Sequence, residues 1–107
     1  MTNSTEPAGK VWYLYLLECL DGSIYTGIAV DVAARYLAHA NGTGARYTRA
    51  HPPRRILASQ SFPDRSSASK AEYRVKQLSP AEKRHLAAQL AASAENQMPV
   101  SVIDKVT

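Results

Sequence analysis

With 107 residues, 45% of them hydrophobic, the chain is long enough for one small domain and too short for two. No apolar run approaches the roughly 18 residues that a membrane span needs, which excludes an integral membrane protein, and residues 1–10 lack the apolar stretch of a secretory signal. The single cysteine, Cys19, can form neither an internal disulfide nor a cysteine-based zinc site. We therefore expect a reduced, cytoplasmic setting without membrane contact.

The net charge of +4 originates in one segment of the chain. Residues 32–63 hold five arginines and no acidic residue, whereas the rest of the chain holds eight basic and nine acidic residues. A basic segment without a basic amphipathic helix suits phosphate better than a membrane surface. It is also typical of a solvated loop rich in arginine, and composition alone does not separate these two interpretations.

The first predicted elements are two strands, over residues 11–18 and 23–29, because β-branched and aromatic residues dominate both runs. Asp21 and Gly22 between them are a strong hairpin signal. The length of the hairpin loop decides which side chains share a face of the sheet, since neighbouring residues of a strand point to opposite sides.

Two registers of this hairpin are possible. A two-residue turn pairs Tyr15 with Ile28 and puts Tyr15 and Tyr25 on opposite faces. A three-residue loop, with Gly22 in the left-handed conformation, pairs Tyr15 with Gly27 and puts both tyrosines on one face. Residue propensities favour neither register strongly.

A helix is predicted next, over residues 32–41, with Asp31 as its N-cap and Gly42 as its stop. Arg35 and His39, four residues apart, are expected to share one face of this helix. A different, apolar face is expected to contain Ala33, Tyr36, Leu37 and Ala40.

The second half of the chain is predicted to contain one strand and two helices. Residues 42–53 are predicted to be a loop, 54–62 a strand, 66–78 a helix and 80–92 a further helix. Ser79 and Glu82 form a capping box at the start of the last helix, with proline at its first position.

The element order β-β-α-β-α-α predicts a small α+β domain, a three-stranded antiparallel sheet flanked by helices, over residues 11–92. Residues 1–10 are expected to be a disordered N-terminal tail, and residues 93–107 a flexible C-terminal tail.

Few side chains suggest chemistry singly. The sequence contains no glycine-rich phosphate loop, paired-carboxylate motif or Ser/His/Asp pattern. Glu72 flanks the apolar stripe of its helix, but an exposed ion pair with Lys76 is the ordinary interpretation of that spacing. Tyrosines on strands are usually core or cross-strand residues. Gly27 within a strand indicates a bulge or a close backbone approach.

Taken together, these residues resemble a known family. Tyr13-Leu14-Tyr15, then Tyr25-Thr26-Gly27, then Arg35 eight residues after the glycine, are similar to the motifs of the GIY-YIG nucleases. His39 and Glu72 extend the match, which covers about residues 11–82 and resembles the small stand-alone bacterial members, the YhbQ-like group. Tyr13 stands in place of the family's first glycine, and Thr26 in place of its isoleucine.

The resemblance implies the three-residue hairpin loop and a role for each matched residue. Glu72 would hold a single divalent metal ion, Mg²⁺ or Mn²⁺, because magnesium accepts one carboxylate and retains waters. Tyr15 or Tyr25 would deprotonate or orient the attacking water; Tyr15 is the preferred base, with Tyr25 assisting, and the sequence does not separate the two. Arg35 would neutralise charge on the phosphate, and His39 would support the site or transfer a proton. The structural residues at the site would be Tyr13, Thr26 and Gly27.

The resemblance also gives the basic segment a role in binding backbone phosphates, which positions a strand without reading its sequence. The expected function is a metal-dependent endonuclease of DNA repair or recombination with little sequence specificity. Its expected substrate is single-stranded or structured DNA, with RNA possible. The nucleic-acid-binding candidates are Arg46, Tyr47, Arg49, His51, Arg54 and Arg55.

Two other functions fit the same residues less closely. A non-catalytic module could bind nucleic acid on the same fold, and the departures at Tyr13 and Thr26 leave room for it. A protein-interaction domain would use the last helix and the residues after it for docking. Neutralising Arg46, Arg49 and Arg54 would leave that last function intact.

Overall fold

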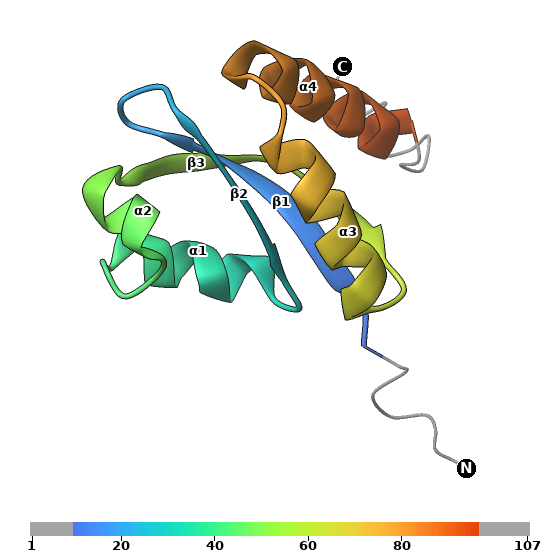
Figure 1. Ribbon diagram of the computed structural model, residues 1–107, viewed down its shortest axis with the longest axis horizontal. Coiled ribbons are helices and arrows are strands. Elements are labelled where there is room, and N and C mark those ends of the chain that lie inside the picture. Colours follow the sequence, from blue (N-terminus) through green and yellow to red (C-terminus); the bar gives the residue numbers. More distant parts are fainter. Residues whose placement is uncertain (1–9, 97–107) are drawn as a thin grey trace, which may run out of the picture.

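The computed structural model describes residues 10–96, which form a three-stranded sheet with helices on both faces (Figure 1). The strands are β1 (Trp12–Cys19), β2 (Ile24–Ala29) and β3 (Pro53–Phe62). Their order in the sheet is β2-β1-β3, and both pairings are antiparallel. The predicted α+β class and three-stranded antiparallel sheet are confirmed.

β1 is the central strand because its sequence is apolar on both faces. Leu14 and Leu16 point to one face, where Val75 and other side chains of the C-terminal helices cover them. Tyr15 and Leu17 alternate with them and point to the opposite face. The sheet therefore separates two clusters of different character, an aliphatic one and an aromatic one.

The hairpin between β1 and β2 has the three-residue loop. The Cys19 N–H donates to the Ser23 carbonyl (2.9 Å), the Gly22 N–H donates to the Cys19 carbonyl (2.9 Å), and Gly22 has a φ of 87°. Tyr15 is therefore paired with Gly27, so the register that the resemblance implied is confirmed and the two-residue turn is wrong.

Helix α1 (Val32–Ala40) begins as predicted, with the Asp31 carboxylate accepting from the Ala34 N–H (3.0 Å). Its predicted apolar stripe is wrong at three of four positions, because Leu37 is 61% exposed and both Ala33 and Ala40 face solvent. The fourth, Tyr36, packs against the aromatic cluster as expected. The helix turns His39 inward instead. A buried polar ring is stable there because the fold supplies a hydrogen-bond partner for each of its nitrogens.

A short helix, α2 (Arg46–Ala50), lies within the segment predicted to be a loop. Figure 1 shows it beside α1. Five residues show too little periodicity to be recognised, and its N-cap, Ala45, makes no side-chain cap. Glycines precede this helix and prolines follow it.

The C-terminal helices are α3 (Arg65–Lys76) and α4 (Pro80–Asn96), on the other face of the sheet from α1. In the predicted capping box, the Ser79 N–H donates to Glu82 Oε1 (2.8 Å) and the Glu82 N–H donates to Ser79 Oγ (3.2 Å). α4 runs four residues beyond its predicted end. The expected tails, apart from Lys10 and residues 93–96, lie outside the described residues.

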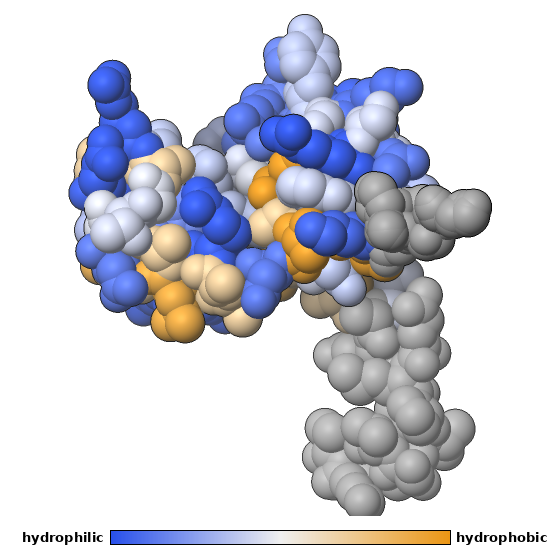
Figure 2. All heavy atoms as spheres, turned by 90° about the horizontal axis from the view of Figure 1, so that it is seen from below, coloured by the Kyte–Doolittle hydropathy of each residue, from blue (hydrophilic) through white to orange (hydrophobic). Residues whose placement is uncertain are grey.

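The surface seen in Figure 2 is mostly hydrophilic, with apolar residues in small separate groups. Among the described residues, no helix combines the length and the apolar character that crossing a membrane requires.

Candidate active site

Tyr15, Tyr25 and His39 meet on the face of the sheet that α1 covers. The ring centroids of Tyr25 and His39 are 5.0 Å apart in an edge-on arrangement, and those of Tyr15 and Tyr25 are 6.3 Å apart. The hairpin register puts the two tyrosines on one face, and the N-cap at Asp31 sets the helix that carries His39. Three of the predicted site residues are thus brought together.

A buried chain of hydrogen bonds runs through this cluster. The Tyr15 hydroxyl lies 3.0 Å from His39 Nε2, and His39 Nδ1 lies 2.7 Å from Thr48 Oγ1. The Thr48 hydroxyl donates to the Ala45 carbonyl (2.9 Å). Tyr15, His39 and Thr48 are each about 1% exposed, so this chain is shielded from solvent.

The chain determines where the protons lie. Thr48 has one hydroxyl proton and gives it to Ala45, so it can only accept from His39. We therefore assign the proton of the neutral imidazole to Nδ1. Nε2 is then an acceptor, and the Tyr15 hydroxyl donates to it.

Burial shifts the pKa values of His39 and Tyr15 in opposite directions. It lowers the pKa of His39, with a further contribution from the Arg35 guanidinium, which keeps the imidazole neutral. Burial also raises the pKa of Tyr15, as do the neighbouring Tyr25 and the Glu72 carboxylate, while Arg35 acts against them. Tyr15 is thus a phenol that donates to a neutral histidine.

Two glycines make room for this arrangement. A Cβ atom at Gly27 would lie 2.6 Å from the Tyr15 hydroxyl oxygen, because the tyrosine ring crosses directly over its strand partner. A Cβ atom at Gly44 would lie 2.9 Å from His39 Cα and closer still to the imidazole. Any side chain at either position would displace one end of the Tyr15–His39 pair.

Glu72 comes from α3, which packs on the other face of β1 and β2. Its side chain is 22% exposed, and its Oε2 lies 3.2 Å from Lys76 Nζ. The ordinary ion pair therefore forms, and the carboxylate is also near enough to raise the pKa of Tyr15. The site thus draws residues from both faces of the sheet around β2, which is an edge strand.

The carboxylate of Glu72 is a donor of the kind that magnesium accepts. Among the side chains that the structure describes, no group of three or more His, Cys, Asp or Glu residues could hold a metal ion, so protein side chains alone would not fill the coordination sphere of an ion at Glu72. Mg²⁺ is commonly bound by one or two carboxylates together with waters and substrate phosphates. The partial exposure of Glu72 leaves space for those other ligands.

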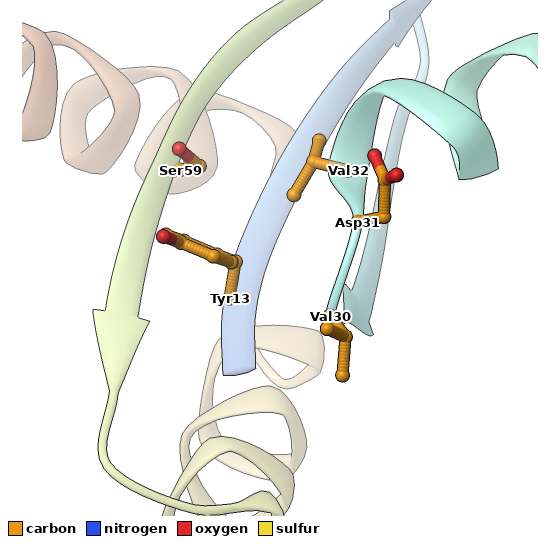
Figure 3. Close-up of a pocket in the computed structure, with 5 residues that line it drawn as sticks. All are labelled: Tyr13, Val30, Asp31, Val32 and Ser59. Carbon is orange, nitrogen blue, oxygen red and sulfur yellow. The ribbon is translucent and has the colours of Figure 1, made fainter. Parts of the chain in front are cut away.

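Tyr13 lies apart from the cluster. It lines a cavity of about 440 Å³ between β3 and the start of α1, with its ring directed toward β3 and Ser59, and with Val30 and Asp31 across from it (Figure 3). Thr26, in contrast, is buried on β2 between the two motif residues Tyr25 and Gly27.

Some side chains of the basic segment are exposed, and others are paired with acidic or aromatic groups. Arg35, Arg46, Arg49 and Arg54 are exposed. Arg55 Nε donates to Glu18 (2.8 Å), a carboxylate that Arg84 also binds (2.8 Å). His51 is hydrogen-bonded to Asp21 in the hairpin loop, and the Tyr47 ring stacks on both His51 (4.2 Å) and Tyr25 (5.8 Å).

Sequence reasoning missed three residues that the structure places at or beside the site. They are Gly44 and Thr48, which contact His39, and Lys83, which lines a cavity together with Tyr25. Thr48 and Gly44 lie in the segment predicted to be a loop, where no periodicity marked an inward side chain. Their alignment with His39 depends on how α2 folds back on α1, which no local signal gives. Lys83 has no distinguishing spacing in the sequence.

The model of the GIY-YIG catalytic domain matches residues 11–85 of the chain. The chain belongs to the GIY-YIG family. This GIY-YIG domain is 57% identical over 70 residues to a UPF0213 protein of Xanthomonas campestris pv. campestris, covering 65% of this chain and 69% of that protein. A UPF0213 protein of Cupriavidus necator is 51% identical over 86 residues, covering 80% and 94%.

Among solved structures, the solution NMR structure of the protein EF2693 from E. faecalis matches with a TM-score of 0.54 and 33% identity, covering 86% of this chain and 93% of that one. Small bacterial relatives of this kind confirm the predicted GIY-YIG, YhbQ-like group. The domain is accordingly of the nuclease type, with nucleic acid as its class of substrate.

Proposed function

We propose that this GIY-YIG domain is a metal-dependent endonuclease that hydrolyses phosphodiester bonds in DNA with little sequence specificity, in cytoplasmic repair or recombination. The observation that carries the proposal is the buried hydrogen bond from the Tyr15 hydroxyl to His39 Nε2, beside Tyr25 and within the field of Arg35 and Glu72. A module that only binds nucleic acid has no need of a shielded phenol–imidazole pair.

The Tyr15–His39 pair would make it possible for a tyrosine to act as a base at neutral pH. A phenol with a pKa near 10 or above is a poor base at neutral pH. In the proposed step, a water that enters past Tyr25 gives a proton to the Tyr15 oxygen while the Tyr15 proton passes to His39 Nε2. The water becomes the nucleophile, and the positive charge ends on an imidazole whose Nδ1–H is already bound to Thr48.

The other residues act on the phosphate and on the water. Tyr25 is the more exposed of the two tyrosines and would orient the water at the surface of the cluster. Arg35, on the exposed side of α1, would neutralise charge that develops on the phosphate oxygens. A Mg²⁺ or Mn²⁺ ion bound by Glu72 would polarise the scissile phosphate and stabilise the leaving oxygen.

Weak sequence specificity follows from the kinds of side chain at the surface. The exposed arginines of α1, α2 and β3 suit phosphate oxygens, which carry no sequence information directly. We therefore expect substrates to differ by strand structure and not by base sequence.

The test uses labelled single-stranded, duplex and branched DNA, and single-stranded RNA, with and without Mg²⁺. Glu72→Gln should lower Mg²⁺-dependent cleavage by roughly 100-fold or more, because a metal-stabilised leaving group is worth several kcal/mol. Glu82→Gln is the matched control, since glutamine preserves the capping box, and it should cut at the parental rate.

Two outcomes would contradict the proposal. If Glu72→Gln cuts as fast as the parent, Glu72 does not hold a catalytic metal. If the parent shows salt-sensitive binding and no Mg²⁺-dependent product on any substrate, the domain is a binding module.

A further inference from the structure

A second cavity, of about 380 Å³, lies on the open side of β2. Its walls come from four elements, with Tyr25 and Thr26 on β2, Tyr47 on α2, Lys76 on α3 and Lys83 on α4. It is separate from the cavity at Tyr13 and shares Tyr25 with the candidate active site. Its volume falls near the lower end of small-molecule sites, roughly 300–1,000 Å³, which suits one nucleotide unit and not a duplex.

The cavity has more positive than negative charge. Lys83 is half-buried, and within the described part of the chain it forms no salt bridge. Burial, followed by the nearby Lys76 ammonium, lowers the pKa of Lys83. Lys76 forms an ion pair with Glu72, with 3.2 Å between Nζ and Oε2. Two ammonium groups beside one cavity with a single carboxylate favour binding of an anion.

The edge strand adds polar groups to the same wall. Cys19 and Ser23 are hydrogen-bonded partners, so in an antiparallel pair the N–H and C=O of Ile24 and Thr26 point away from β1. The Thr26 side chain is 2% exposed, and among the described residues its buried hydroxyl has no hydrogen-bond partner. Such a group is typical of a site that a ligand or water completes.

The aromatic side of the cavity suits an unpaired base. Tyr47 is 39% exposed. One face of its ring stacks closely on His51 (4.2 Å), whereas its contact with Tyr25 is looser (5.8 Å, 26°) and involves the two tyrosines that line the cavity. Single-stranded nucleic acid is commonly held by aromatic rings beside cationic side chains, because every base has a face that can stack. A base inside a duplex has both faces covered by its stacked neighbours.

We propose that this cavity binds an unpaired nucleotide next to the scissile bond, with its phosphate on Lys76 and Lys83 and its base against Tyr47. The binding of an unpaired nucleotide rests on the proposed function only in taking nucleic acid as the substrate, whereas its place beside the scissile bond also takes Tyr25 and Glu72 as the proposed site of cleavage. A phosphate in the cavity also competes with Glu72 for Lys76, so occupation of the cavity would free the carboxylate for a metal ion.

The test measures binding without cleavage. Fluorescence anisotropy in EDTA follows the affinity for a fluorescein-labelled eight-nucleotide thymidine strand and for a short labelled DNA hairpin whose duplex is blunt. Lys83→Gln should weaken binding of the single strand about five- to tenfold and reduce its salt slope by about 0.7. Lys70→Gln, which removes one exposed charge of α3 outside the cavity, should change the affinity less than about twofold.

Tyr47→Leu should weaken binding of the single strand and leave that of the hairpin unchanged. Thermal unfolding of each variant verifies that it is folded, and a parental ¹H–¹⁵N NMR titration with thymidine monophosphate should shift the amides of Thr26, Lys76 and Lys83. Equal effects of Lys83→Gln and Lys70→Gln would overturn the inference, as would equal losses on both DNAs. If the parent never cuts DNA but Lys83→Gln and Tyr47→Leu selectively lose binding of the single strand, the proposed nuclease is contradicted and the nucleotide-binding site is still supported.

Discussion

Thr48 decides which nitrogen of His39 carries the proton. Its hydroxyl accepts from Nδ1 and donates to the Ala45 carbonyl, which leaves Nε2 free to accept from Tyr15. Thr48→Val keeps the shape and removes the acceptor. We expect the imidazole to lose its single tautomer and cleavage to fall about 10- to 100-fold, as when other partners that orient a histidine are removed. The ¹⁵N shifts of the His39 ring report the tautomer directly.

Thr48→Ser restores the hydroxyl and should restore both the ring shifts and the rate. A Thr48→Val protein that cuts slowly while its ring shifts match the parent would limit Thr48 to a packing role. Retention of the parental rate would remove it from the site altogether.

Among single residues, those that were predicted belong to a sequence motif, whereas those that were missed depend on tertiary contacts. Tyr15, Tyr25 and His39 belong to a spaced motif, so the resemblance could name them before the fold was known. Thr48 and Gly44 act through His39 only after α2 has folded back on α1, and such contacts leave no local mark. Gly27 could be anticipated in part, because a glycine inside a strand indicates close approach.

At the scale of the elements, the stability of α4 depends on its capping box. Ser79→Ala removes the oxygen that accepts from the Glu82 N–H, which should lower the free energy of unfolding by about 1 kcal/mol. Urea unfolding followed by circular dichroism measures this. Ser93→Ala, at an exposed position of the same helix, should be neutral or slightly stabilising, and equal losses in both variants would exclude a capping effect.

Elements with local end signals were predicted well. Asp31 and the Ser79–Glu82 pair set the starts of α1 and α4 because a cap acts within one turn. The hairpin register was not fixed by propensity and needed the resemblance. The buried face of α1 was predicted wrongly because the apolar residues were expected to mark it, whereas His39 on a different face is the buried residue and two hydrogen bonds make its burial stable.

For the whole molecule, stability should depend on the protonation of one buried histidine. Burial lowers the pKa of His39 below its ordinary value of 6.5, so between the two values the unfolded chain holds more protons than the folded one. The free energy of unfolding should therefore fall as the pH drops from about 7.5 to about 5.5. The lowered pKa values of Glu18, Asp21 and Asp64 act at more acidic pH.

Thermal unfolding across that range tests this expectation. His39→Gln should be less stable at neutral pH and should show a flatter dependence, while His85→Gln, at an exposed position of α4, should keep the parental slope. Equal slopes in the parent and in His39→Gln would show that other groups control the transition.

The layered architecture was predictable from the sequence because β1 is apolar at every position from Leu14 to Leu17 and each face needs a cover. The hydrophobic pattern of β1 could not show that the residues packed on its two faces differ in kind. One face is an aliphatic core under α3 and α4, and the other holds the aromatic rings under α1.

The hydrogen-bond chain that starts at Tyr15 ends at a peptide carbonyl, that of Ala45. A carbonyl has no proton to pass on and no capacity to store one, so the chain has a single entrance. On the proposed mechanism, His39 is a reservoir for one proton, which must leave through Tyr15 before the next bond is cut. The proton then returns, and the product leaves, by the same side of the cluster at Tyr15. The rate of turnover would therefore depend on how quickly the product leaves Tyr15 accessible.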